Sequence, residues 1–187
     1  MAITEVSICA NALRKLGDNP ITSLTDDSER ARLMNAVYQE TRDSVLRAYP
    51  WNFAIARQSL SRELAVPDFG YGYQFTLPQD PYCLRALYMY YTKSEFKIEG
   101  RKLLTNDDEV DLVYISRVTD TSQFDMLFVQ ALEARLAAEV CYAVTGSNSL
   151  RQEFVAEYME KLREARSIDA QEGSADAFYS DTLTEVR

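Results

Sequence analysis

Apolar and polar positions between residues 24 and 49 follow the spacing of an amphipathic helix. Asp26 and Glu29 are spaced as a capping box, which predicts a helix start near residue 27. Pro50 predicts its end, because the residue before a proline is disfavoured in a helix. The apolar stripe consists of Leu33, Met34, Val37, Tyr38, Val45, Leu46 and Tyr49. The pattern predicts a helix over residues 27–49.

Three further segments have helical spacing, and they predict helices over residues 3–16, 124–145 and 149–170. Gly17 suits the position that follows the end of the first of these helices. The stripe expected on the third helix consists of Leu127, Phe128, Ala131, Leu132, Ala138 and Tyr142. The stripe expected on the fourth consists of Leu150, Phe154, Tyr158, Leu162 and Ala165. Each stripe predicts either a core face or a face for a partner.

The pattern changes between residues 70 and 118, where β-branched and aromatic residues become frequent and glycine and proline mark turns. Strand-like stretches lie at residues 73–77, 84–92, 95–99, 102–105 and 110–118. Gly100 supplies a tight turn between two of them. We expect one small, mostly antiparallel sheet.

These elements predict a mainly helical α+β fold. It consists of a four-helix bundle, a small antiparallel β lobe inserted between the second and third helices, and an extended C-terminal arm. The expected division is residues 1–66 for the first half of the bundle, 67–122 for the lobe, 123–170 for the second half and 171–187 for the arm. Trp51 follows the second helix directly, so we expect it to be a buried anchor where bundle meets lobe.

Two groups of residues are candidates for an interface. Six of the twelve tyrosines lie between residues 71 and 91, and among them Tyr71 and Tyr73 either fill a thin core or form a contact surface. The polar segment from residue 169 to 187 is either a frayed end or an arm that orders on a partner. Its apolar residues are Phe178, Tyr179, Leu183 and Val186.

The charge distribution narrows the possible functions. The chain of 187 residues has a net charge of −9, and its first 67 residues contain eight basic and eight acidic side chains. The negative excess therefore lies in residues 68–187. An acidic protein repels nucleic acid, which argues against specific DNA binding but is compatible with a channel through which DNA slides. No apolar run approaches the length of a membrane span.

Residues that carry catalysis or bind metals are scarce. The chain contains no histidine, which removes the commonest general base and metal ligand. The three cysteines are isolated, and the acidic run at residues 106–109 lacks the length and central glycine of a calcium loop. We therefore expect no cofactor, no metal and no enzymatic activity, and we expect residues 106–109 to form a hairpin turn.

A series of short motifs resembles the tail tubular protein A family, the head-to-tail adaptors of short-tailed bacteriophages. The motifs are Leu13-Arg14-Lys15-Leu16-Gly17, Tyr49-Pro50-Trp51-Asn52-Phe53-Ala54, Tyr71-Gly72-Tyr73 with Leu77-Pro78 and Asp80, Tyr114-Ile115-Ser116-Arg117-Val118, and Leu136-Ala137-Ala138-Glu139. Their order and spacing span most of the chain.

The resemblance implies a structural protein of the virion, assembled in the host cytoplasm and placed at the head–tail junction. The family forms rings, usually dodecamers, between the portal protein and the tail nozzle protein, and genomic DNA passes through the ring. The alternative is a virion-associated cell-wall hydrolase with a carboxylate pair, for which Glu95 and Glu99 are the candidates.

Overall fold

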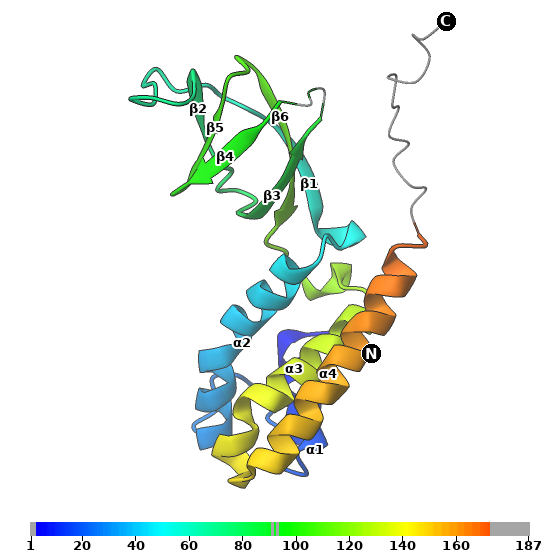
Figure 1. Cartoon of the computed structure of the whole chain (residues 1–187). Helices are drawn as coiled ribbons and strands as arrows, with labels where there is room; N and C mark the ends of the chain where they lie inside the picture. Colours follow the sequence, from blue (N-terminus) through cyan, green and yellow to red (C-terminus); the bar gives the residue numbers. More distant parts are fainter. Residues whose placement is uncertain (1–2, 91, 93, 173–187) are drawn as a thin grey trace, which may run out of the picture.

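The computed structural model describes residues 3–90, 92 and 94–172, and it shows a mixed α+β fold. Four helices, α1 (Glu5–Lys15), α2 (Glu29–Ala48), α3 (Met126–Thr145) and α4 (Asn148–Asp169), gather at one end of the molecule (Figure 1). All six strands lie between α2 and α3 in the sequence and gather at the other end. We call α1–α4 the helical part and residues 55–116 the β part.

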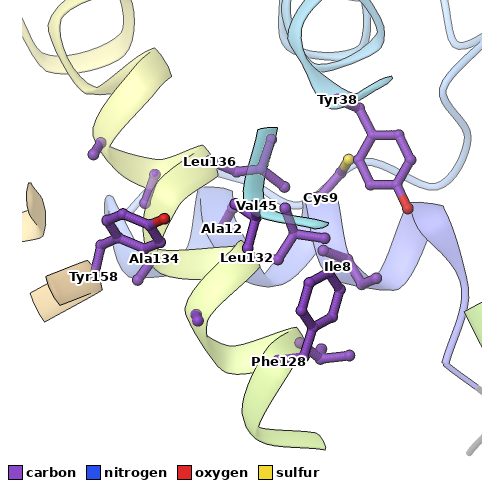
Figure 2. Close-up of a cluster of buried hydrophobic side chains, with 14 of the residues drawn as sticks. Ile8, Cys9, Ala12, Tyr38, Val45, Phe128, Leu132, Ala134, Leu136 and Tyr158 are labelled. Carbon is purple, nitrogen blue, oxygen red and sulfur yellow. The ribbon is translucent and has the colours of Figure 1, made fainter. Parts of the chain in front are cut away.

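Helix α3 is the central element of the helical part. Eleven of its 20 residues are buried, and α1, α2 and α4 all pack against it. Figure 2 shows side chains from all four helices meeting in this core, among them Ile8, Val45, Leu132 and Tyr158. Tyr142, at the C-terminal end of the stripe expected on α3, is 58% exposed, whereas Phe128, Ala131, Leu132 and Ala138 of that stripe are buried. The stripe predicted for α4 is confirmed at its four buried positions, residues 154, 158, 162 and 165.

The helix ends follow local side-chain chemistry. Helix α1 ends in a Schellman arrangement, in which the N–H of Gly17 donates to Arg14 and the N–H of Asp18 donates to Leu13. The predicted cap of α2 is wrong: Ser28 is the N-cap residue, and its hydroxyl accepts from the N–H of Ala31. The carboxylate of Asp26 instead accepts hydrogen bonds from residues 22 and 23, so it closes the preceding loop.

The β part contains two antiparallel sheets, whereas the sequence predicted one. The strands are β1 (Ile55–Leu60), β2 (Tyr73–Thr76), β3 (Cys83–Met89), β4 (Phe96–Glu99), β5 (Lys102–Thr105) and β6 (Val110–Ser116). One sheet has the order β1-β6-β3 and the other the order β2-β5-β4. The expected hairpin of β4 and β5 around Gly100 is confirmed.

The acidic run at residues 106–109 connects the two sheets and is not a hairpin turn, because β5 and β6 do not pair with each other. The side chain of Asn106 accepts from the N–H of Gly72 at 2.9 Å. The carboxylate of Asp107 accepts from the hydroxyl of Ser94 at 2.8 Å. These contacts hold the connection against neighbouring loops, a role that the charge pattern alone did not reveal.

Strand β1 begins before the range of residues 70–118 in which strands were expected. It pairs with β6 from Ile55↔Ile115 to Leu60↔Val110 and forms an edge of its sheet. Four of its six residues are exposed, and its apolar residues lie at its two ends, so the apolar alternation that identifies a half-buried strand is missing.

The central strand β6 joins the two cores of the molecule. Ile115 belongs to the core of the helical part, whereas Leu112 and Tyr114 belong to a smaller core between the two sheets. Because successive side chains of a strand point to opposite faces, β6 is buried on both of its faces. The first sheet therefore contacts the helices with one face and the second sheet with the other.

Candidate functional site

The helical and β parts meet at a joint formed by the residues that follow α2. Trp51 is fully buried there, as predicted, and its indole N–H donates to the carbonyl of Val45 at 3.1 Å. Its ring contacts Tyr49 and Phe128 edge-on, with centroids 5.1 and 5.2 Å apart, and stacks with Phe53 at 6.2 Å. A short 3-10 helix over Asn52–Ala54 then leads directly into β1.

The C-terminal end of α4 clamps this joint. The carboxylate of Asp169 accepts from the backbone N–H of Asn52 at 3.1 and 3.3 Å. The side-chain amide of Asn52 donates to the carbonyl of Asp169 at 2.6 Å. Arg166 donates to the carbonyl of Ala48 at 3.3 Å, and its guanidinium lies 5.4 Å from the centre of the Tyr49 ring. Segments 117 residues apart in the sequence are thereby held together.

In this clamp, burial has the largest effect on the pKa of Asp169. It raises the pKa of Asp169 above its usual value of 3.8, while the hydrogen bond from the N–H of Asn52 acts in the opposite direction. The negative charges of Glu172 and Asp125 add to the rise. Asp169 could not be recognised from the sequence alone, because nothing in the sequence pairs it with residue 52.

A cleft of about 610 Å³ lies beside the joint, between α2 and the β part. Four arginines line it, and they are opposed by two carboxylates. The arginines are Arg47 on α2, Arg85 on β3, Arg101 in the turn between β4 and β5, and Arg117 just after β6; the carboxylates are Glu40 and Asp43 on α2. Its apolar lining includes Leu77, Leu84, Ala86 and Ile98. We call this site the arginine cleft.

Two of these arginines contact the same aromatic ring. The guanidinium carbons of Arg101 and Arg117 lie 4.1 and 4.3 Å from the centre of the Tyr82 ring. Arg101 also donates to the carbonyls of Cys83 and Pro78, at 2.7 Å each. Cation–π contacts and charge-assisted hydrogen bonds both restrict a guanidinium, so Arg101 is held in one orientation.

Asp43 links an arginine of the cleft to a buried arginine of the helical part. One carboxylate oxygen accepts from Nε of Arg117 at 2.7 Å, and the other accepts from Arg42 at 2.9 Å. Arg42 is buried, and it also lies 3.7 Å from Glu5. Asp43 is thus shared between a buried arginine of α2 and an arginine that follows β6. This network could not be predicted from the sequence, because its members are far apart in the chain.

The candidate interface residues Tyr71 and Tyr73 lie at the end of the β1–β2 loop, which we define as residues 61–72, and at the start of β2. Both side chains are half-buried, and the guanidinium of Arg62 lies 5.0 Å from the centre of the Tyr73 ring. Tyr73 also packs against the core of the β part. Tyr73 therefore has a structural role, which leaves any contact role as a prediction.

The same loop exposes apolar side chains that the sequence analysis did not name. Leu64 and Phe69 are 104% and 88% exposed, and Val66 is 62% exposed. Figure 1 shows the β1–β2 loop projecting from the end of the molecule that lies away from the helices. The clustering of Pro67 and Gly70 marked this stretch as a turn but gave no sign that its apolar residues would be exposed.

The other candidate interface residues, Phe178, Tyr179, Leu183 and Val186, lie outside the described residues, as do residues 173–187 of the expected arm. The arm hypothesis therefore stays a prediction.

The two carboxylates of the hydrolase alternative lie on or beside the exposed strand β4. Glu99 is the last residue of β4, and its carboxylate lies 2.9 Å from the amine of Lys97. Glu95 precedes the strand and is exposed. Neither residue lines the arginine cleft.

Within the part of the chain that the structure describes, no group of acidic, cysteine or histidine side chains could hold a metal ion. All three cysteines are buried and unpaired, and burial raises the pKa of the Cys9 thiol to about 12. A thiol with a raised pKa, such as that of Cys9, is a poor nucleophile, because the thiolate is the reactive form. Among the described helices, none has both the length and the apolar character needed to cross a bilayer.

Comparison with known proteins does not assign the chain to a family. The chain matches no protein-family model, and a search among curated proteins gives no significant match.

Proposed function

We propose that the chain is the subunit of a head-to-tail adaptor ring, which joins the portal protein to the tail nozzle protein of a short-tailed bacteriophage. The ring is a homo-oligomer, expected to be a dodecamer, and it forms part of the channel through which DNA is ejected. In this proposal the four helices are a bundle, the β part is an inserted lobe, and residues 171–187 are an arm. The role is structural and requires no cofactor.

The observation that carries the proposal is the position of one of the resembling motifs, residues 49–54. Residues 49–54 form the joint between the helical and β parts, where Trp51 is buried and Asn52 is bound by Asp169. An adaptor subunit has to hold two interaction surfaces in a fixed relative position, and a clamped joint of this kind serves that need. The motif residues thus have a physical role that fits the resemblance.

Two surface features agree with assembly into a ring. The β1–β2 loop exposes Leu64, Val66 and Phe69, and exposed apolar residues that lie together often mark protein contacts. The chain is acidic, so a channel lined by it would offer little adhesion to DNA phosphates. A ring closes when two different patches of neighbouring subunits meet at the correct rotation.

The test combines the purified chain with portal rings of its own phage and examines the mixture by electron microscopy. We expect a second ring stacked on the portal, with a channel of net negative charge. A chain that stays monomeric and leaves the portal rings bare would contradict the proposal, as would a channel lined with lysine and arginine.

The arm is tested by deletion of residues 172–187. The segment from residue 173 onward lies outside the described residues, and the core residues of both parts lie before it. We therefore expect the truncated chain to keep the free energy of unfolding of the full chain while its affinity for portal rings falls. Equal affinity of the two chains would show that the segment is only a chain end.

A further inference from the structure

The arginine cleft contains more positive than negative groups in a protein of net charge −9. Four arginines line it, together with Glu40 and Asp43. Asp43 already binds Arg42 and Arg117, so its charge is shared by two arginines. A local positive site within an acidic molecule needs either counterions or an anionic partner.

Some of these guanidinium groups have N–H donors that bind no partner among the described residues. The guanidinium of Arg85 has no hydrogen-bond or ion-pair partner among residues 3–90, 92 and 94–172. In Arg117 only Nε is used, by Asp43, so its two Nη atoms have no hydrogen-bond partner in the same described part of the chain. Its side chain is 37% exposed and therefore accessible. Guanidinium forks of this kind match carboxylate groups in geometry and charge.

The part of the cleft around Arg101 and Arg117 is ordered before any partner arrives. Both Arg101 and Arg117 contact the ring of Tyr82, and Arg101 also donates to the carbonyls of Cys83 and Pro78. Arginines that are already held lose less side-chain entropy on binding, which favours affinity. The lining also contains apolar residues, of which Ile98 is 39% exposed.

We propose that the arginine cleft binds an acidic polypeptide segment, in which carboxylate side chains flank an apolar residue. The carboxylates pair with the open donors of Arg85 and Arg117, and the apolar residue contacts the side of the cleft that contains Ile98. The proposal goes beyond the adaptor function and does not depend on it.

The charge pattern favours a polypeptide over a nucleic acid. Nucleic acids bind mainly through several neutralised phosphates, and each cation that is already paired contributes less. In the cleft, Arg101 binds backbone carbonyls and Arg47 donates to the carbonyl of Leu84. Glu40 and Asp43 would repel a continuous phosphate backbone, whereas one or two carboxylates can reach the open guanidiniums.

The test measures binding of the full-length chain to a fluorescein-labelled peptide built of Glu-Leu-Glu-Gly repeats, by fluorescence anisotropy at low salt. A peptide with glutamine in place of every glutamate is the neutral control, and an oligothymidylate of equal net charge represents nucleic acid. We expect the glutamate peptide to bind most tightly and its affinity to fall as salt is added.

The decisive variant is Arg85→Glu. The guanidinium of Arg85 binds no partner among the described residues, so the substitution breaks no hydrogen bond or ion pair there. Its matched control is Arg163→Glu, which makes the same charge change at an exposed position of α4 away from the cleft. We expect Arg85→Glu to weaken peptide binding by about tenfold or more, the size of a lost charged hydrogen bond, and Arg163→Glu to change it by less than about twofold.

Circular dichroism checks the fold of each variant, and Arg85→Gln provides a milder change that is expected to weaken binding about threefold. Equal effects of Arg85→Glu and Arg163→Glu would overturn the proposal, because binding would then reflect only bulk charge. Tighter, Arg85-dependent binding of the oligothymidylate would overturn it in favour of a nucleic-acid site. Absence of binding to the glutamate peptide at low salt would also overturn it. None of these measurements requires a portal or a ring, so failure here is distinct from failure of the adaptor proposal.

Discussion

The helical part and the β part are stabilised by different kinds of interaction. In the helical part a central helix, α3, is buried on most of its surface, and the other three helices pack around it. The β part has a small core between two three-stranded sheets, and β4 has no fully buried residue. Polar contacts supplement this thin core, as when Arg101 binds two backbone carbonyls. Where apolar burial is limited, hydrogen bonds and cation–π contacts contribute a larger share of the stabilisation.

The largest expected effect concerns the joint that connects these two parts. Trp51→Ala removes a fully buried ring that contacts three aromatic side chains, so the free energy of unfolding should fall by about 3–5 kcal/mol. Urea denaturation measures the change. Phe69→Ala is the control, because that ring is 88% exposed and its loss should matter by less than about 0.5 kcal/mol. Similar losses in both variants would mean that the joint does not support the fold as described.

The next effect tests whether polar contacts support the β part. Arg101→Met keeps much of the aliphatic stem but removes the hydrogen bonds to Cys83 and Pro78 and the contact with Tyr82. We expect a loss of about 1–2 kcal/mol in the free energy of unfolding, with the largest rise in hydrogen exchange in β3 and β5. Arg163→Met on α4 is the matched control. A uniform rise over all helices and strands would contradict a role confined to the β part.

A smaller effect concerns the pH dependence of the joint. The folded protein holds the proton of Asp169 more tightly than the unfolded chain, because its pKa is raised above 3.8. Its contribution to stability is therefore fully present below that value and declines as the pH rises through the raised pKa. Asp169→Asn lacks this titration and keeps an oxygen that can accept from Asn52. The stability of the variant relative to the parent should rise over this pH range, as measured by urea denaturation at a series of pH values. A constant difference would contradict the raised pKa.

The smallest effect on stability is expected in the β1–β2 loop. Leu64→Ser and Phe69→Ser change exposed side chains, so the free energy of unfolding should move by less than about 0.5 kcal/mol. If the loop is a contact surface, the same variants should weaken self-association, which analytical ultracentrifugation measures. Thr119→Ser provides an exposed control outside the loop. Unchanged association would remove the loop from the candidate contact surfaces.

Elements with strong local periodicity could be predicted from the sequence. All four helices lie close to their expected ranges, and the β4–β5 hairpin follows from Gly100 and the alternation around it. Strand β1 was missed because it is a mostly exposed edge strand. The two-sheet arrangement was missed because alternation identifies a strand but not its partner.

The arginine cleft and the clamp at the joint could not be predicted for a related reason. Arg117 meets Asp43 across 74 positions of sequence, and Asp169 meets Asn52 across 117. Each of these residues alone looks like an ordinary surface charge or amide. Only the packing of the β part against α2, and of α4 against the joint, brings them together.

The placement of the β part within the chain has a consequence for synthesis on the ribosome. Residues 55–116, within which Ile55 pairs with Ile115 in the fold, leave the ribosome before α3 does. Because α3 and α4 supply much of the core against which α1 and α2 pack, the first two helices must wait with their apolar faces uncovered. The β part can thus fold while α1 and α2 still expose apolar surface, and such surface is prone to aggregation until α3 emerges.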